Sequence, residues 1–175
     1  MATQDVDYET ILLSLKMRVS AERNFVANLS NVSASLWYQL RLVERLTPIN
    51  WLGFYVATGS LSEVTQAPAL VLGPFQGKPA CSRIGSGSGV CGAAAEQRRT
   101  VLVPDVHDFP GHIACDPSSQ SEVVVPLIEP ASGVLVGVLD IDSSAINSFT
   151  QGDVVGLEKI AAFIVSSCDW PSQWA

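Results

Sequence analysis

The sequence predicts an α+β fold, because segments with helical periodicity lie at its two ends and apolar, β-branched segments lie between them. Its length of 175 residues is usual for one domain. With 47% hydrophobic and 15% charged residues, the composition is typical of a globular chain. The sequence contains no internal repeat, low-complexity tract or linker. Residues 1–175 are therefore predicted to form a single domain that includes a helical segment at 1–20.

Two helices are predicted near the N-terminus, at residues 11–17 and 25–46, because apolar residues recur there at three- and four-residue spacing. Pro48 ends the second helix. Three strands are predicted next, where β-branched and aromatic residues are divided by glycine and proline. They cover residues 49–57, 67–75 and 78–85.

The second half of the chain is predicted to contain a short helix at 93–98, a strand at 100–106 and a long structured loop at 105–120. Two apolar segments, 121–130 and 133–142, are separated by a Pro-Ala-Ser-Gly turn and predict a hairpin. Thr150 and Asp153 form a helix cap, and an apolar stripe continues from there to Ile164. The chain is therefore expected to end in a third long helix.

The charge balance excludes two classes of partner. The net charge is −7, the pI is about 4.6 and only ten residues are Lys or Arg. Nucleic acid and anionic membranes are therefore poor partners, since both require a basic patch. The N-terminus is acidic and lacks the features of a signal peptide, and no apolar run approaches the roughly 18 residues that span a membrane. A cytoplasmic protein is the expectation.

A glycine-rich loop precedes the short central helix, and Gly87, Gly89 and Gly92 match the G-x-G-x-x-G fingerprint of dinucleotide sites. A Rossmann unit would need a long helix after the loop and an acidic residue about 20 positions later. Hairpins follow here instead, so a nucleotide site is not predicted. The loop is either a tight turn between elements or a platform for Cys91. Near a helix N-terminus the amides and the dipole would lower the thiol pKa from about 8.5 and receive a small carboxylate.

Four cysteines carry the main chemical signal, and they are Cys81, Cys91, Cys115 and Cys168. In a reducing compartment such thiols serve as buried bulk, metal ligands or redox catalysts. No metal site is predicted, because there is no C-x-x-C pair and only His107 and His112 offer ring nitrogens. These histidines are interpreted as loop hydrogen-bonders. Three cysteines cluster around two irregular loops, as a cycle with attacking and resolving thiols requires. Cys168, on the last helix, is expected to have no catalytic role.

Three acidic residues stand at the ends of paired strands. Glu122 opens one strand of the predicted hairpin, and Asp140 and Asp142 end the other on one side of it. They are either solvated or converge on a pocket, where mutual repulsion would raise at least one pKa and supply a proton donor. Such a pocket would also attract an ammonium group. Trp51 and Tyr55 share a strand face, and they either pack in the core or form an aromatic cage.

Several long segments of the chain carry a resemblance to a known family. They include "INWLGFYV", "LVLGPFQGKPACSRI", "GVCGAAA", "VPDVHDFPGHIACDPSSQSEVVVPL" and "GVLVGVLDIDS". They resemble the free methionine-(R)-sulfoxide reductases, which are enzymes built on a GAF-type domain. The resemblance implies an antiparallel sheet of about six strands with helices packed on one face, and a homodimer. It also implies reduction of free L-methionine (R)-S-oxide with electrons from thioredoxin and no bound cofactor.

Residue roles follow from the same resemblance. Cys115 corresponds to the cysteine that attacks the sulfoxide and becomes a sulfenic acid. Cys91 would then form a disulfide with it, and Cys81 would be an auxiliary or second resolving thiol. Substrate binding falls to two groups of side chains. The acids Glu122, Asp140 and Asp142 would hold the ammonium group and activate the sulfoxide oxygen. The aromatic pair, Trp51 and Tyr55, would hold the methyl-sulfur end.

The alternative comes from another functional class, a GAF-type sensor module that binds a small ligand such as a cyclic nucleotide without catalysis. One fold hosts both functions, so the fold alone does not decide. The three grouped cysteines favour the enzyme. Counting thiols after addition of free methionine sulfoxide separates the two hypotheses, because a sensor would lose none.

Overall fold

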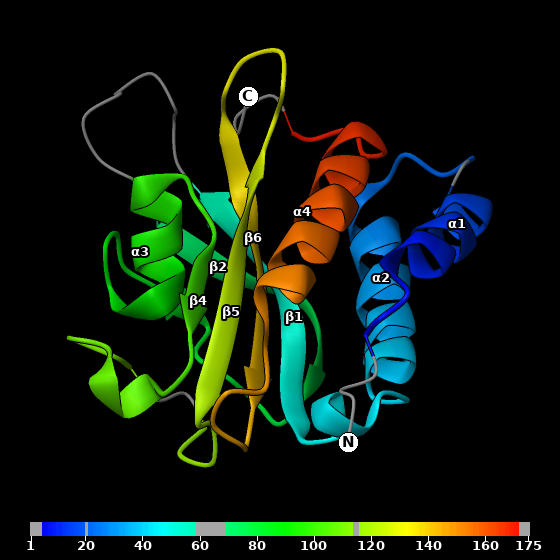
Figure 1. Ribbon diagram of the computed structural model, residues 1–175. Helices are drawn as coiled ribbons and strands as arrows, with labels where there is room; N and C mark the ends of the chain where they lie inside the picture. Colours follow the sequence, from blue (N-terminus) through cyan, green and yellow to red (C-terminus); the bar gives the residue numbers. More distant parts are fainter. Residues whose placement is uncertain (1–4, 20, 59–68, 114–115, 172–175) are drawn as a thin grey trace.

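The computed structural model describes residues 5–19, 21–58, 69–113 and 116–171, which form a sheet between two helical layers (Figure 1). Six strands make one sheet in the order β3-β2-β1-β6-β5-β4, and every neighbouring pair is antiparallel. The strands are β1 (Ile49–Thr58), β2 (Ala69–Gly77), β3 (Arg83–Ile84), β4 (Val101–Val103), β5 (Ser121–Ile128) and β6 (Leu135–Ser143). The predicted α+β class, the sheet of about six strands and the hairpin of β5 and β6 are confirmed.

Three helices cover one face of the sheet, and they are α1 (Tyr8–Val19), α2 (Phe25–Leu40) and α4 (Gln151–Ser166) (Figure 1). Alternate residues of β1, such as Leu52 and Phe54, pack with these helices in the larger core. The predicted cap of α4 is confirmed, since Thr150 and Asp153 form a reciprocal capping box. None of the described helices is long and apolar enough to cross a membrane.

The fourth helix, α3 (Gly89–Gln97), lies on the opposite face of the sheet, which corrects the expectation of helices on one face only (Figure 1). The reason is visible in the strands. Trp51 and Tyr55 of β1 point away from the larger core, so this second face also has apolar side chains to bury. The small residues of α3, including Ala94 and Ala95, pack against them. The two faces thus have different functions: one is core, and the other contains a cavity.

Some predicted boundaries differ from the structure. The second helix ends at Leu40 and is followed by a separate 3₁₀ turn at Glu44–Leu46. Leu46 is nevertheless fully buried, which explains why the apolar pattern continued past the helix. Only Arg83–Ile84 of the predicted strand at 78–85 pairs with the sheet, and α3 begins four residues earlier than expected. In the described parts of the loop at 105–120, which are 105–113 and 116–120, the one helical element is a 3₁₀ turn at Val106–Asp108.

Candidate active site

A cavity of about 150 Å³ lies between α3 and the second face of the sheet. Its volume is below the roughly 300–1,000 Å³ of pockets for drug-sized ligands, so it suits a small metabolite and not a dinucleotide. Every predicted site residue that the structure describes contributes to its wall, namely Trp51, Tyr55, Cys81, Cys91, Glu122, Asp140 and Asp142. Cys115, the predicted attacking cysteine, lies outside the described residues.

The strand register brings the three acids together. Glu122 of β5 pairs with Asp142 of β6, and Asp142 also pairs with Trp51 of β1. Asp140 stands two residues before Asp142, so its side chain leaves the sheet on the same face. Glu122 and Asp140 are each only 6% exposed. The interpretation of these acids as solvated strand ends is therefore wrong, and they converge on the cavity as the alternative required.

Burial determines the protonation of these acids. It is the largest influence raising the pKa of all three carboxyl groups well above the usual range. Mutual repulsion adds to it: Asp142 raises the pKa of Glu122, Glu122 that of Asp140, and Asp140 that of Asp142. A cluster that retains protons near neutral pH can donate one to a bound substrate. A bound cation would have the opposite effect and favour ionisation.

The charge of this cluster is poorly compensated by its neighbours. His112 Nε2 lies 3.6 Å from Glu122 Oε2, but burial lowers the pKa of His112, so its ring is neutral near pH 7. Arg83 also lines the cavity, but its side chain is exposed. Within the described residues, no buried lysine or arginine lines the cavity. The cavity therefore favours a ligand that carries a positive charge.

Aromatic rings form the opposite wall. The ring of Trp51 stacks on Tyr55 at 5.7 Å between centroids and on Phe75 at 5.4 Å. Trp51 Nε1 donates a hydrogen bond to the Lys78 carbonyl oxygen, which fixes the indole over the sheet. The indole can lie there because residue 53 is glycine: a Cβ at Gly53 would lie 2.7 Å from the Trp51 ring. Burial, followed by the charge of Asp140, raises the pKa of Tyr55, so its hydroxyl stays protonated.

The glycine-rich loop is explained by packing and does not require a nucleotide. Gly87 and Gly89 adopt positive φ angles of 67° and 61°, which turn the chain into α3. A Cβ at Gly92 would lie 2.8 Å from the backbone of Gly87, so the loop can lie directly on the helix. The first turn of α3 lines the cavity through Gly89 and Val90, and helix geometry leaves its amides free of intrahelical partners.

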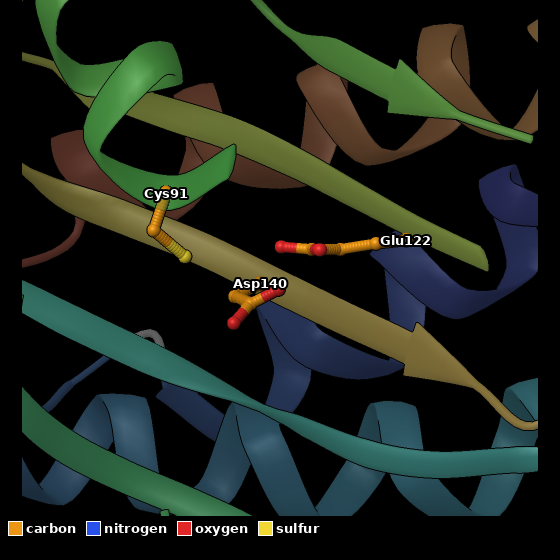
Figure 2. A group of neighbouring side chains, drawn as sticks. All are labelled: Cys91, Glu122 and Asp140. Carbon is orange, nitrogen blue, oxygen red and sulfur yellow. The ribbon is translucent and has the colours of Figure 1, made fainter. Parts of the chain in front are cut away.

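Cys91 lies near the N-terminus of α3, as predicted, but it is inside the helix as its third residue and its thiol is not activated. It is 4% exposed, and burial followed by the nearby Asp140 and Glu122 raises its pKa well above the usual value. The expected lowering by the helix N-terminus is therefore wrong, because burial and two acidic neighbours outweigh the dipole. Cys91 Sγ lies within 4.8 Å of a carboxylate oxygen of Asp140. Figure 2 shows Cys91, Glu122 and Asp140 directed toward one another.

The remaining cysteines differ in state. Cys81, which lines the cavity beside β3, is disulfide-bonded. Cys91 is a free thiol. Cys168 is also free and lies in the larger core, where Asn28 Nδ2 approaches its sulfur to 3.7 Å. Cys168 is thus remote from the cavity, in agreement with the expectation that it takes no part in chemistry.

Sequence reasoning missed several polar residues of this site. Lys78 Nζ lies 3.2 Å from Asp116 Oδ2, which links the segment before Cys81 to the segment after Cys115. Asp116 also accepts hydrogen bonds from the Ser118 backbone N–H and hydroxyl, and these bonds lower its pKa to about 2. Ser119 hydrogen-bonds to Asp142. These residues lie in a loop whose sequence has no helical or strand periodicity, so no pattern indicated them. The one available clue was the short D-x-S spacing of an Asx turn.

The two histidines, His107 and His112, lie in different environments in the structure. His107 is exposed, and its Nδ1 lies 2.7 Å from Asp105 Oδ1, so it is a loop hydrogen-bonder as predicted. His112 instead lines the cavity beside Glu122. Its interpretation as a simple loop residue was incomplete, because the irregular segment that carries it folds over the sheet.

Comparison with known proteins agrees with this geometry. The GAF domain family model matches residues 39–166. The chain is 44% identical over 160 residues to a free methionine-R-sulfoxide reductase of Saccharomyces cerevisiae, with 91% of this chain and 84% of that protein covered. It is 46% identical over 144 residues to the Escherichia coli free methionine-R-sulfoxide reductase, with 82% and 78% covered.

The chain belongs to the free methionine-R-sulfoxide reductase family. This family consists of oxidoreductases on a GAF domain. The X-ray structure of the Neisseria meningitidis enzyme, in complex with its substrate, matches this fold with a TM-score of 0.76 and 38% identity, and covers 91% of this chain and 87% of that one. The predicted resemblance is thereby confirmed at the level of family and fold.

Proposed function

We propose that this protein reduces free L-methionine (R)-S-oxide to L-methionine. The observation that carries the proposal is the group of three carboxyls, two of them buried and that of Asp142 partly buried, in a small cavity that is also lined by Cys81 and Cys91. Membership of the reductase family supports the same substrate. The structure of the cavity also gives a physical reason for each part of the reaction.

The substrate is proposed to bind through its two ends. Its ammonium group would pair with the carboxylates, which lack a buried cation among the described residues. Its carboxylate would accept hydrogen bonds from the amides in the first turn of α3, where the helix dipole is positive. The methyl-sulfur end would lie against Trp51, which presents a flat apolar surface in the cavity.

The reaction then proceeds in balanced steps. The Cys115 thiolate attacks the sulfoxide sulfur while one of the cavity acids protonates the oxygen, so a bond forms between the two sulfur atoms as the S–O bond breaks and hydroxide leaves. That hydroxide attacks the Cys115 sulfur, methionine leaves with the electron pair of the S–S bond, and Cys115 is oxidised to a sulfenic acid. A second thiol attacks that sulfenic acid, which releases water and forms a disulfide. All three acids are candidates for the proton donor, because each has a raised pKa.

We assign the resolving role to Cys81 in preference to Cys91. Cys81 is already disulfide-bonded, whereas Cys91 is a free thiol. A protonated thiol is a poor nucleophile, and the pKa of Cys91 is raised by burial and by Asp140. Cys91 instead forms part of the cavity wall beside Asp140 and Glu122. This assignment reverses the order of the two thiols suggested by the family resemblance.

The electrons are proposed to come from thioredoxin in the cytoplasm, which would reopen the disulfide by thiol exchange. This route needs no bound cofactor, because both reducing equivalents pass through cysteine sulfur. A homodimer remains a prediction, and sedimentation of the full chain tests it.

The proposed binding mode predicts selectivity for the free amino acid. Free methionine (R)-S-oxide is expected to be reduced, and the same sulfoxide within a peptide is expected to react at least about 100-fold more slowly, since a peptide amide leaves buried acids without their charged partner. The (S) epimer should also be inert. The measurement is methionine release with each substrate under identical conditions, and equal rates for the free and peptide sulfoxides would contradict the binding mode.

The same assay tests the sensor alternative. A binding module without catalysis would bind the sulfoxide without loss of thiols and without release of methionine. The proposed enzyme must lose thiols as methionine appears, even without thioredoxin.

A further inference from the structure

We propose that Cys91, Glu122 and Asp140 form a zinc-binding site within the cavity, so that zinc competes with the amino-acid substrate. Zinc binding itself is independent of the reductase reaction. The competition rests on the proposed function, because it requires that the substrate ammonium use the same carboxylates.

The geometry of the three side chains supports this site. Cys91 Sγ and one carboxylate oxygen each of Glu122 and Asp140 all lie within 4.8 Å of one another (Figure 2). Around a tetrahedral zinc ion with bond lengths of about 2.0–2.3 Å, such atoms are roughly 3.3–3.8 Å apart. Side-chain movements of about 1 Å would therefore bring the three atoms to coordinating positions.

A second observation points to a missing partner. Asp140 Oδ1 is buried and has no hydrogen-bond donor among the described residues, and Asp140 as a whole is 6% exposed. Buried polar oxygens normally have partners, so this one faces a position that a ligand would fill. A cation at that position would also relieve the repulsion between Asp140 and Glu122.

The donor set selects among metals. A thiolate is a soft ligand that magnesium and calcium avoid, while zinc accepts sulfur together with carboxylate oxygen. His112 Nε2 lies 3.6 Å from Glu122 Oε2, a spacing compatible with two ligands of one zinc ion. Water or this neutral ring would complete the coordination. The site was not predictable from the sequence, because its ligands come from α3, β5 and β6 and do not form a local motif.

The experiment uses the full chain after mild oxidation, verified by thiol counting, so that the disulfide-bonded Cys81 cannot act as a ligand. Zinc chloride is titrated by calorimetry, and cobalt(II) is added separately to detect a thiolate-to-metal charge-transfer band. We expect about one zinc per chain, at least about tenfold weaker binding in Cys91→Ser and in Asp140→Asn, and loss of the cobalt band in Cys91→Ser. Free methionine (R)-S-oxide should weaken the apparent zinc affinity.

Matched controls are available in the same chain. Cys168→Ser removes the other described free thiol, and Glu129→Gln removes a partly buried acid of the β5–β6 turn that does not line the cavity, so both should bind zinc as the wild type does. Melting curves verify that each variant is folded, and Asp140→Asn decides the matter if Cys91→Ser does not fold. Absence of zinc uptake by the wild type, or unchanged binding in both site variants, would overturn the proposal. Methionine release in chelator-treated buffer tests the reductase activity separately. Failure of the zinc site and failure of the proposed function can therefore be distinguished.

Discussion

Replacement of Cys115 by serine is expected to abolish methionine release even in a single turnover. A serine hydroxyl near neutral pH is a far weaker nucleophile than a thiolate, and the other two thiols near the site are assigned other roles. The measurement mixes reduced protein with excess free methionine (R)-S-oxide, without thioredoxin, and counts methionine and remaining thiols. The wild type should release about one methionine per chain and lose about two thiols, because the sulfenic acid is resolved to a disulfide.

The other cysteine variants separate resolution from attack. Cys81→Ser should release about one methionine per chain and then stop as the sulfenic acid, since attack precedes resolution. Cys91→Ser should release the same amount and still form a disulfide, because Cys81, the assigned resolving thiol, is unchanged. Cys168→Ser is the matched control and should cycle normally with thioredoxin, as its sulfur lies in the larger core.

Two results would change these assignments. If Cys91→Ser stops as the sulfenic acid while Cys81→Ser forms a disulfide, Cys91 is the resolving thiol, as the family resemblance first suggested. If Cys115→Ser still releases methionine, the attacking sulfur is another cysteine. Release by none of the proteins, the wild type included, would favour the sensor alternative.

Much of the fold was predictable because its signals are local. The apolar segment 133–142 and the Pro-Ala-Ser-Gly turn before it identified β6, and the Thr150 and Asp153 pair identified the start of α4. The position of α3 on the second face was not predictable from periodicity. Its nine residues are mostly small and have no distinct polar face, so their sequence does not tell which surface they cover.

The candidate site was likewise predictable only in part. The composition of the cavity wall was largely predictable, since strand alternation placed Asp140 and Asp142 on one side and the motif resemblance supplied the rest. The chemical state of Cys91 was not, because its pKa depends on Asp140 and Glu122 approaching it from two strands. Local helix-terminus reasoning considered one influence, and burial, which only the folded chain reveals, proved larger.

Replacement of Asp140 by asparagine is expected to lower activity and raise stability together, as is replacement of Glu122 by glutamine. An amide cannot donate the proton or pair with the ammonium group, and loss of one charge-assisted hydrogen bond of roughly 1.5–3 kcal/mol slows turnover by about tenfold or more. Burial and repulsion penalise each carboxylate in the free protein. Its removal should therefore raise the free energy of unfolding by roughly 1–3 kcal/mol near pH 7.5.

The pH dependence of this stability gain shows whether buried charge is its cause. The pKa values of these acids are higher in the folded than in the unfolded chain, so the folded chain binds more protons above about pH 4. Their contribution to the free energy of unfolding therefore decreases as pH rises through the folded-state pKa values. His112 has the opposite sign below about pH 6.5, because its folded pKa is lowered by burial. Comparison of Asp140→Asn with the wild type at each pH cancels the His112 contribution, whereas Glu122→Gln also removes the carboxylate 3.6 Å from the His112 ring.

The measurement is chemical denaturation of the wild type and both variants from pH 5 to 8, beside steady-state rates of methionine release. The stability gain of each variant should be small at pH 5 and grow toward pH 8, and turnover by the wild type should fall over the same range as the proton donor ionises. Glu129→Gln is the matched control: Glu129 is only partly buried, and bonds from Ser132 and Ala131 lower its pKa, so its removal should bring no such gain. A gain that does not vary with pH would mean that packing, and not buried charge, separates the variants from the wild type. Variants with wild-type turnover would show that these acids neither hold nor protonate the substrate.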